Sequence, residues 1–215
     1  MIDSKPANVA VSFSCRKGRV VRSELEMLQL TEADQVLLLQ IARVAVRSHV
    51  LGRPFTPPEI TSDNLTESCG IFVSIHKNGE LRGCIGNVQG SGPLYRRVGE
   101  CAISAAVADP RFAPVEPHEL PLIDFEISVL SPMERVIAIT EIEVGKHGLL
   151  ISKGHHRGLL LPQVAMAYRW DRETFLRETC RKAGLGQDDW KDGAIIHRFS
   201  AFVFSEKHLH QTVPS

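Results

Sequence analysis

The run IFVSIHKNGELRGCIG, residues 71–86, is the strongest local structural signal in the chain. Two runs rich in β-branched and apolar residues flank Asn78-Gly79, a dipeptide typical of two-residue hairpin turns because both turn positions need a positive φ. The sequence therefore predicts an antiparallel hairpin that reverses at Asn78-Gly79.

A two-residue turn also sets the register of the two strands. The predicted pairs are Lys77 with Glu80, Ile75 with Arg82, and Val73 with Cys84. Because side chains alternate between the faces of a strand, Arg82 and Cys84 are expected on the apolar face that carries Val73. We therefore expect Cys84 to be mostly buried beside Val73, with the Arg82 guanidinium two residues away.

Capping residues and hydrophobic periodicity predict further elements along the chain. A helix is expected to begin after Thr31, with Asp34 completing its cap, and to end before Gly52. A second begins at Pro93 and ends at Asp109-Pro110, because the residue before a proline leaves the helical conformation. The other predicted elements are helices over 163–168 and 172–183, strands over 9–13, 123–130 and 195–204, and a hairpin with strands 149–152 and 159–161. This mixture of hairpins and helices, without regular strand–helix alternation, predicts an α+β fold.

Composition excludes several classes of protein. Apolar residues make up 43% and charged residues 23% of the 215, which are ordinary globular values. Lys plus Arg equal Asp plus Glu at 25 each, so net charge gives nucleic-acid binding no support. The N-terminus lacks a signal-peptide pattern and no apolar run is long enough to cross a membrane, so we expect a cytoplasmic protein with no membrane association.

The five cysteines are scattered and form no CxxC pair, which argues against a disulfide framework and a structural zinc site. Cys84 is the candidate nucleophile or redox thiol, because Arg82 and the backbone beside Gly83 and Gly86 would favour a thiolate. The alternative is a small buried residue in a strand. The two glycines favour a site, since glycine within a strand often marks close approach of a ligand or of another backbone.

Two other residues extend this candidate site. His147, between two glycines, is a candidate proton shuttle for Cys84, and a loop histidine without a role is the alternative. Arg111 would bind an anionic group or pair with an acid, and Arg82 would grip an anion or form an ion pair with an acid such as Glu126. No cofactor motif occurs, and we expect neither a cofactor nor a bound metal.

Several blocks of the chain closely resemble the AMMECR domain family, which includes the AmmeMemoRadiSam system protein A. They are LRGCIGN, AAVADPRFAPVEPHEL, ISVLSP, GKHGLLIS, LLLPQVA and WDRETFLRETCRKAGL, in this order. The resemblance implies a domain over 30–206, with a variable extension at 1–29 and a tail at 207–215. It also implies two unequal lobes, each an antiparallel sheet with flanking helices, with both termini in the larger lobe and most LRGCIG side chains directed into the cleft between them.

The resemblance supplies no reaction, although it suggests RNA modification and association with Memo-like and radical-SAM proteins. Two hypotheses follow. The first is an enzyme or enzyme component in which Cys84 is the reactive thiol, His147 shuttles protons, and Arg82, Gly83, Gly86 and Arg111 bind an anionic small molecule. The second is a non-catalytic module that binds a protein partner or RNA, in which LRGCIG is structural.

Overall fold

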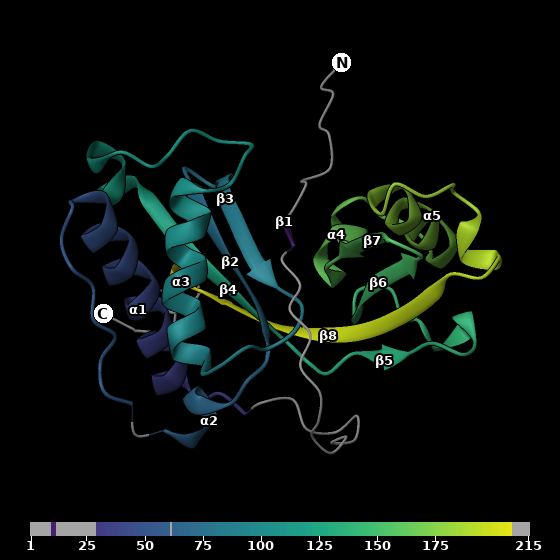
Figure 1. Cartoon of the computed structure of the whole chain (residues 1–215), viewed down its shortest axis with the longest axis horizontal. Helices are drawn as coiled ribbons and strands as arrows, with labels where there is room; N and C mark the ends of the chain where they lie inside the picture. The colour runs from purple at the N-terminus through teal and green to yellow at the C-terminus, as the bar shows by residue number, and fades with distance from the viewer. Residues whose placement is uncertain (1–9, 12–28, 61, 208–215) are drawn as a thin grey trace. The chain divides into compact units, whose positions relative to one another are not determined.

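The structure is a computed structural model that describes residues 10–11, 29–60 and 62–207. It divides the chain into two compact units, the first comprising residues 1–129 and 202–215 and the second residues 130–201. Both units combine strands with helices (Figure 1), so the predicted α+β class is confirmed. None of the described helices is long and apolar enough to span a membrane.

The first unit contains a sheet with the hydrogen-bonded order β1-β3-β2-β4-β8, and α1 and α3 lie on one side of it (Figure 1). Its elements are β1 (Ala10–Val11), α1 (Glu32–Val50), α2 (Asp63–Thr66), β2 (Gly70–Lys77), β3 (Glu80–Asn87), α3 (Leu94–Val107), the 3-10 helix η1 (Pro117–Leu122), β4 (Ile123–Leu130) and the end of β8 (Ile195–Ser205). Buried Val73 and Ile75 of β2 share one core with Phe125 of β4 and with Leu38 and Val98 of the helices. These strand positions therefore mark the helix-facing side of the sheet.

The predicted hairpin turn is confirmed in β2 and β3. Asn78 and Gly79 have φ angles of 55° and 87°, and Lys77 pairs with Glu80 as expected. The pair His76 with Leu81 also fits the predicted register, but from Ile75 onward that register is wrong. The observed pairs are His76 with Leu81, Ile75 with Gly83, Ser74 with Cys84, and Val73 with Ile85. Arg82 is thus an extra residue on β3, a β-bulge, which shifts every later pair by one position.

Because of the bulge, Cys84 does not lie on the face of the sheet that the sequence predicted. Because Cys84 is opposite Ser74 and not Val73, it lies on the face of the sheet that points away from α3. Its predicted burial is confirmed, since only 4% of the residue is exposed. The buried neighbour of Cys84 is the Ser74 hydroxyl and not Val73, which the sequence predicted. Val73 instead packs in the core beneath the helices.

The second unit contains β8 flanked by β6 and, on its other edge, β5, with β7 beyond β6 and two helices over one face (Figure 1). Its elements are β5 (Glu134–Arg135), η2 (Ile139–Glu141), β6 (His147–Lys153), β7 (His156–Leu160), α4 (Pro162–Ala167), α5 (Arg172–Lys182), η3 (Asp189–Lys191) and most of β8. The predicted β6–β7 hairpin is confirmed, with a turn of only two residues, since Lys153 pairs with His156. Its core packs Leu149 and Ile151 against Phe175 and Leu176 of α5.

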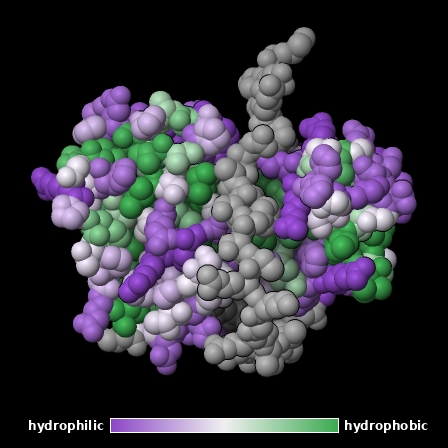
Figure 2. Space-filling view, in the orientation of Figure 1, coloured by the Kyte–Doolittle hydropathy of each residue, from purple (hydrophilic) through white to green (hydrophobic). Residues whose placement is uncertain are grey.

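The helix ends follow the predicted capping chemistry. The Thr31 hydroxyl accepts a hydrogen bond from the Asp34 amide, and the Asp34 carboxylate accepts one from the Thr31 amide, which completes the predicted capping box. Asp171 caps α5 through the Thr174 amide. The sequence did not predict α2, and apart from β1 the strand predicted at 9–13 lies outside the described residues. The face drawn in Figure 2 mixes polar and apolar residues, in keeping with the balanced composition.

Gly83 lies where α3 crosses the hairpin, and a Cβ at this position would be 2.1 Å from the Ala105 carbonyl oxygen. We predict that Gly83→Ala lowers the free energy of unfolding by about 1–3 kcal/mol or more, because backbone must move to relieve the overlap. Urea denaturation measures the change. Gly99→Ala is the matched control on α3, where the nearest atom is the edge of the Phe55 ring at 3.0 Å and alanine favours the helix. Equal stability of the two variants would contradict this account.

Candidate functional site

The outer edge of β3 is held by the carboxylate of Asp109, which follows α3. Asp109 Oδ2 accepts a hydrogen bond from the Cys84 amide at 2.8 Å, and the Arg111 side chain donates to both carboxylate oxygens at 2.9 and 2.6 Å. Burial alone would raise the pKa of Asp109, which is 4% exposed, but the bonds from Arg111 and the Cys84 amide leave this pKa below its ordinary value. A buried, ionised carboxylate therefore joins the β2–β3 hairpin, which carries the LRGCIG motif, to the turn DPRF at residues 109–112.

The positive charge of Arg111 is therefore paired with the Asp109 carboxylate. Its backbone amide also donates to Asp109 at 3.1 Å. Arg111 is thus paired with an acid, the second of the two roles considered for it. Phe112 contacts both arginines of the region, with its ring centroid 5.2 Å from the Arg111 guanidinium carbon and 5.9 Å from that of Arg82.

The thiol of Cys84 lies in a small polar environment on the sheet. The Ser74 hydroxyl donates to the Cys84 sulfur at 3.2 Å. Burial raises the pKa of the Cys84 thiol, and the Ser74 hydrogen bond and the Arg111 charge lower it by less, while the Asp109 and Glu126 charges raise it further. The thiol is therefore protonated at neutral pH, which does not favour nucleophilic attack.

Arg82 forms a two-pronged ion pair with Glu119 of η1. Its Nε and Nη2 donate to the two Glu119 carboxylate oxygens at 3.0 Å each, and Nη2 also donates to the Pro114 carbonyl at 3.3 Å. Lys77 reaches the same carboxylate at 2.8 Å. Arg82 therefore forms an ion pair with an acid, the second of the two roles considered for it. The acid is Glu119 and not Glu126.

The two glycines of the motif are explained by close approach of other protein atoms. Gly83 admits the α3 backbone, and a Cβ at Gly86 would be 2.1 Å from the Ile71 carbonyl oxygen and 2.5 Å from the Phe72 ring. Glycine within a strand can mark close approach of a ligand or of other protein atoms. At both positions, other protein atoms lie where a Cβ would be.

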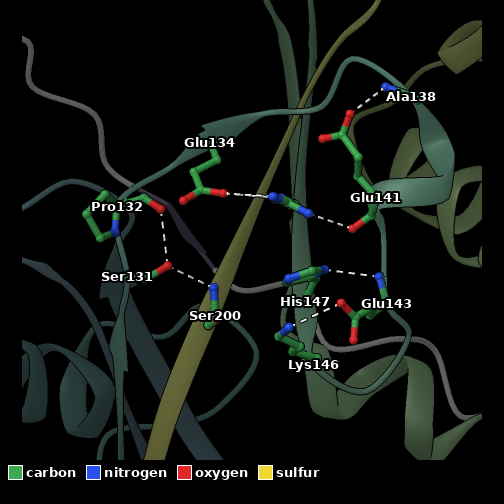
Figure 3. A network of polar contacts seen from close by, with 10 residues as sticks. Ser131, Pro132, Glu134, Ala138, Glu141, Glu143, Lys146, His147 and Ser200 are labelled. Atoms are coloured by element: carbon green, nitrogen blue, oxygen red, sulfur yellow. Dashed lines mark hydrogen bonds and ion pairs between the residues drawn. The ribbon is translucent and has the colours of Figure 1, made fainter. Parts of the chain in front are cut away.

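His147 is the first residue of β6 and belongs to the second unit, whereas Cys84 belongs to the first. His147 is 6% exposed, and its Nδ1 accepts a hydrogen bond from the Glu143 amide at 3.0 Å (Figure 3). The neutral ring therefore carries its proton on Nε2. In the same network Arg198 donates to the Glu141 carbonyl at 2.7 Å and contacts the Glu134 carboxylate at 3.1 Å.

Sequence reasoning missed Glu119 and Ser74, and it treated Asp109 only as part of a helix-ending turn. Glu119 is 37 residues from Arg82 in the chain, and only the folded structure brings them together. The block APVEPHEL contains two acids, Glu116 and Glu119, and nothing in the sequence distinguishes the one that pairs with Arg82. Within the described ranges, no three His, Cys, Asp or Glu side chains gather in a way that could hold a metal ion.

The chain is thus an α+β protein in which buried ion pairs hold a hairpin that carries a cysteine between glycines. The model of the AMMECR1 family matches residues 39–204, so the chain belongs to the AMMECR1 family.

The comparisons with individual proteins agree. A protein of Methanothermobacter thermautotrophicus is 44% identical over 177 residues, covering 79% of this chain and 92% of its own length. One from Thermococcus gammatolerans is 43% identical over 183 residues, with 80% and 89% covered. The crystal structure of the uncharacterized protein PH0010 from Pyrococcus horikoshii is similar, with a TM-score of 0.75 and 38% identity over 79% of this chain and 90% of that one.

The Arg82–Glu119 pair predicts a specific pH dependence. Hydrogen bonds from Arg82 lower the pKa of Glu119 from 4.5 to about 2. Because the pKa is lower in the folded state, the ionised carboxylate stabilises the fold above pH 4.5, and this contribution is lost as the pH falls toward 2. We predict that Glu119→Gln reduces the loss of unfolding free energy between these pH values by up to about 3 kcal/mol.

Urea denaturation at a series of acidic pH values measures this effect. Glu80→Gln, at an exposed position beside the hairpin turn, is the control and should follow the wild-type profile. If Glu119→Gln loses stability with falling pH as steeply as the wild type, the ion pair does not have the predicted energetic role.

Proposed function

We propose that this AMMECR1-family chain is a non-catalytic binding module, and that LRGCIG is its structural frame. The observation that carries the proposal is that the charged groups of the motif region are paired with one another, although Arg82 Nη1 is buried without a hydrogen-bond partner. Arg82 is bound by Glu119, Arg111 is bound by Asp109, and the Cys84 thiol is protonated and buried. A site for an anionic substrate would instead offer an arginine whose charge is available to the ligand.

The proposed partner is a protein. The net charge of zero provides no field that would attract nucleic acid, so RNA is the less favoured partner. The family resemblance supplies Memo-like and radical-SAM proteins as the first partners to test. An enzyme that uses Cys84 as a nucleophile or redox thiol is the competing hypothesis, and the contact between the thiol and Ser74 is the feature that favours it.

The first test is the reactivity of the thiol. We predict that Cys84 in the folded protein reacts with iodoacetamide no faster than Cys101, a core cysteine whose pKa is raised to about 11 by burial. Peptide mass spectrometry after timed alkylation between pH 6 and pH 9 measures the two rates separately. An apparent pKa for Cys84 well below ~8.5 would instead establish an activated thiol and overturn the proposal.

The second test separates binding from chemistry. We predict that Cys84→Ala and Cys84→Ser bind a purified Memo-like or radical-SAM protein from the same organism as tightly as the wild type, within about 3-fold. Arg82→Lys keeps the charge but loses the two-pronged grip on Glu119, so it should weaken binding only as far as it lowers stability. Calorimetric titration and thermal unfolding of the same samples provide both quantities.

Two further measurements could contradict the proposal. One is a functional complementation assay in which both Cys84 variants lose function although partner binding and stability are intact, which would require thiol chemistry. The other is binding to RNA, but not to protein, with an affinity that falls steeply as salt is added.

A further inference from the structure

The first unit contains a cavity of about 510 Å³ that is separate from the Cys84 side of the sheet. Its walls come from three elements, which are the second half of α1, the 3-10 helix η1 and the start of β4. The apolar lining includes Val44, Leu51, Leu120, Ile123 and Phe125. Its volume is within the range of cavities that hold small molecules.

Two arginines one turn apart on α1 also line this cavity, and the first is fully engaged. Arg43 donates through Nε and Nη2 to the two carboxylate oxygens of Glu206, both at 2.6 Å. Nη2 also donates to the Ile123 carbonyl at 2.7 Å, and the guanidinium carbon lies 5.3 Å from the centroid of the Phe125 ring. Arg43 is therefore a fixed part of the cavity wall, with its charge neutralised.

Arg47 differs from Arg43 in this respect. It is exposed, and among residues 10–11, 29–60 and 62–207 it has no ion pair with any carboxylate. In the described part of the chain, the cavity thus presents an apolar surface with one guanidinium at its edge that no carboxylate pairs with. Its complement is a molecule with an apolar body and a single anionic head, and the planar fork of arginine matches a carboxylate best.

The 3-10 helix η1, which forms one wall of this cavity, is joined to the LRGCIG hairpin by an ion pair. Leu120 faces the cavity, while the adjacent Glu119 is buried in its ion pair with Arg82. The LRGCIG hairpin therefore fixes the position of η1, which preorganises the cavity.

We propose that this cavity binds a small carboxylic acid with an aliphatic or aromatic body, and that Arg47 binds its carboxylate. The proposal goes beyond the module's protein partner and does not depend on it. The alternative role for Arg47 is a favourable interaction with the C-terminal end of α1, which needs no ligand.

The test uses the full chain and four probes that separate head from body. These probes are octanoate, octanol, octylammonium and acetate. Calorimetric titration should show octanoate binding on the order of 10-fold more tightly than any other probe, as expected for one charge-assisted contact. Amide chemical shifts that change on titration should map to α1 and η1.

The matched variants are Arg47→Gln and Arg169→Gln, which remove the same charge from the cavity and from an exposed position in the second unit. Arg47→Gln should bring octanoate affinity down to that of octanol, and Arg169→Gln should leave it unchanged. Equal binding of octanoate and octylammonium, undiminished octanoate binding by Arg47→Gln, or shifts mapping elsewhere would overturn the proposal. Because neither variant changes Cys84 or Arg82, failure here leaves the partner-binding test of the module unaffected.

Discussion

The β-bulge at Arg82 determines which surroundings each side chain of the LRGCIG hairpin meets. It inserts one residue into β3 and so sends the two chemically active side chains of the motif to different surroundings. Arg82 reaches the carboxylate of Glu119, which Lys77 also contacts, while Cys84 turns to Ser74 on the other face. Without the extra residue, the guanidinium and the thiol would be neighbours on one face.

Three carboxylates in the first unit join segments that are distant in sequence, and all three use the same set of donors. Asp109, Glu119 and Glu206 each bind an arginine side chain and also accept a hydrogen bond from a backbone amide. At Asp109 and Glu119 these donors hold the pKa of the carboxyl group below its ordinary value, although both residues are buried. The unit therefore uses these charged residues as internal ties, and both arginines near the motif, Arg82 and Arg111, are paired with carboxylates of the protein.

Local signals predicted most of the fold, and long-range contacts account for what they missed. The Asn78-Gly79 turn, the Thr31 cap and the main strands follow from residues that are close in sequence. The register of β3 does not, because a bulge is decided by what each side chain meets after folding. The same reason applies to the site, where cysteine and arginine were recognised as chemical groups but the distant Glu119 that occupies Arg82 was not.

The close approach of α3 to Gly83 has a consequence for how such motifs are interpreted. At this position any side chain would overlap the Ala105 carbonyl, so selection can retain glycine for steric reasons alone. A short signature held in place by such a crossing identifies a shared backbone geometry, whatever reaction or partner each member has. A match to LRGCIG therefore indicates the scaffold, and the residues that give one member its particular role are to be sought outside the hexapeptide.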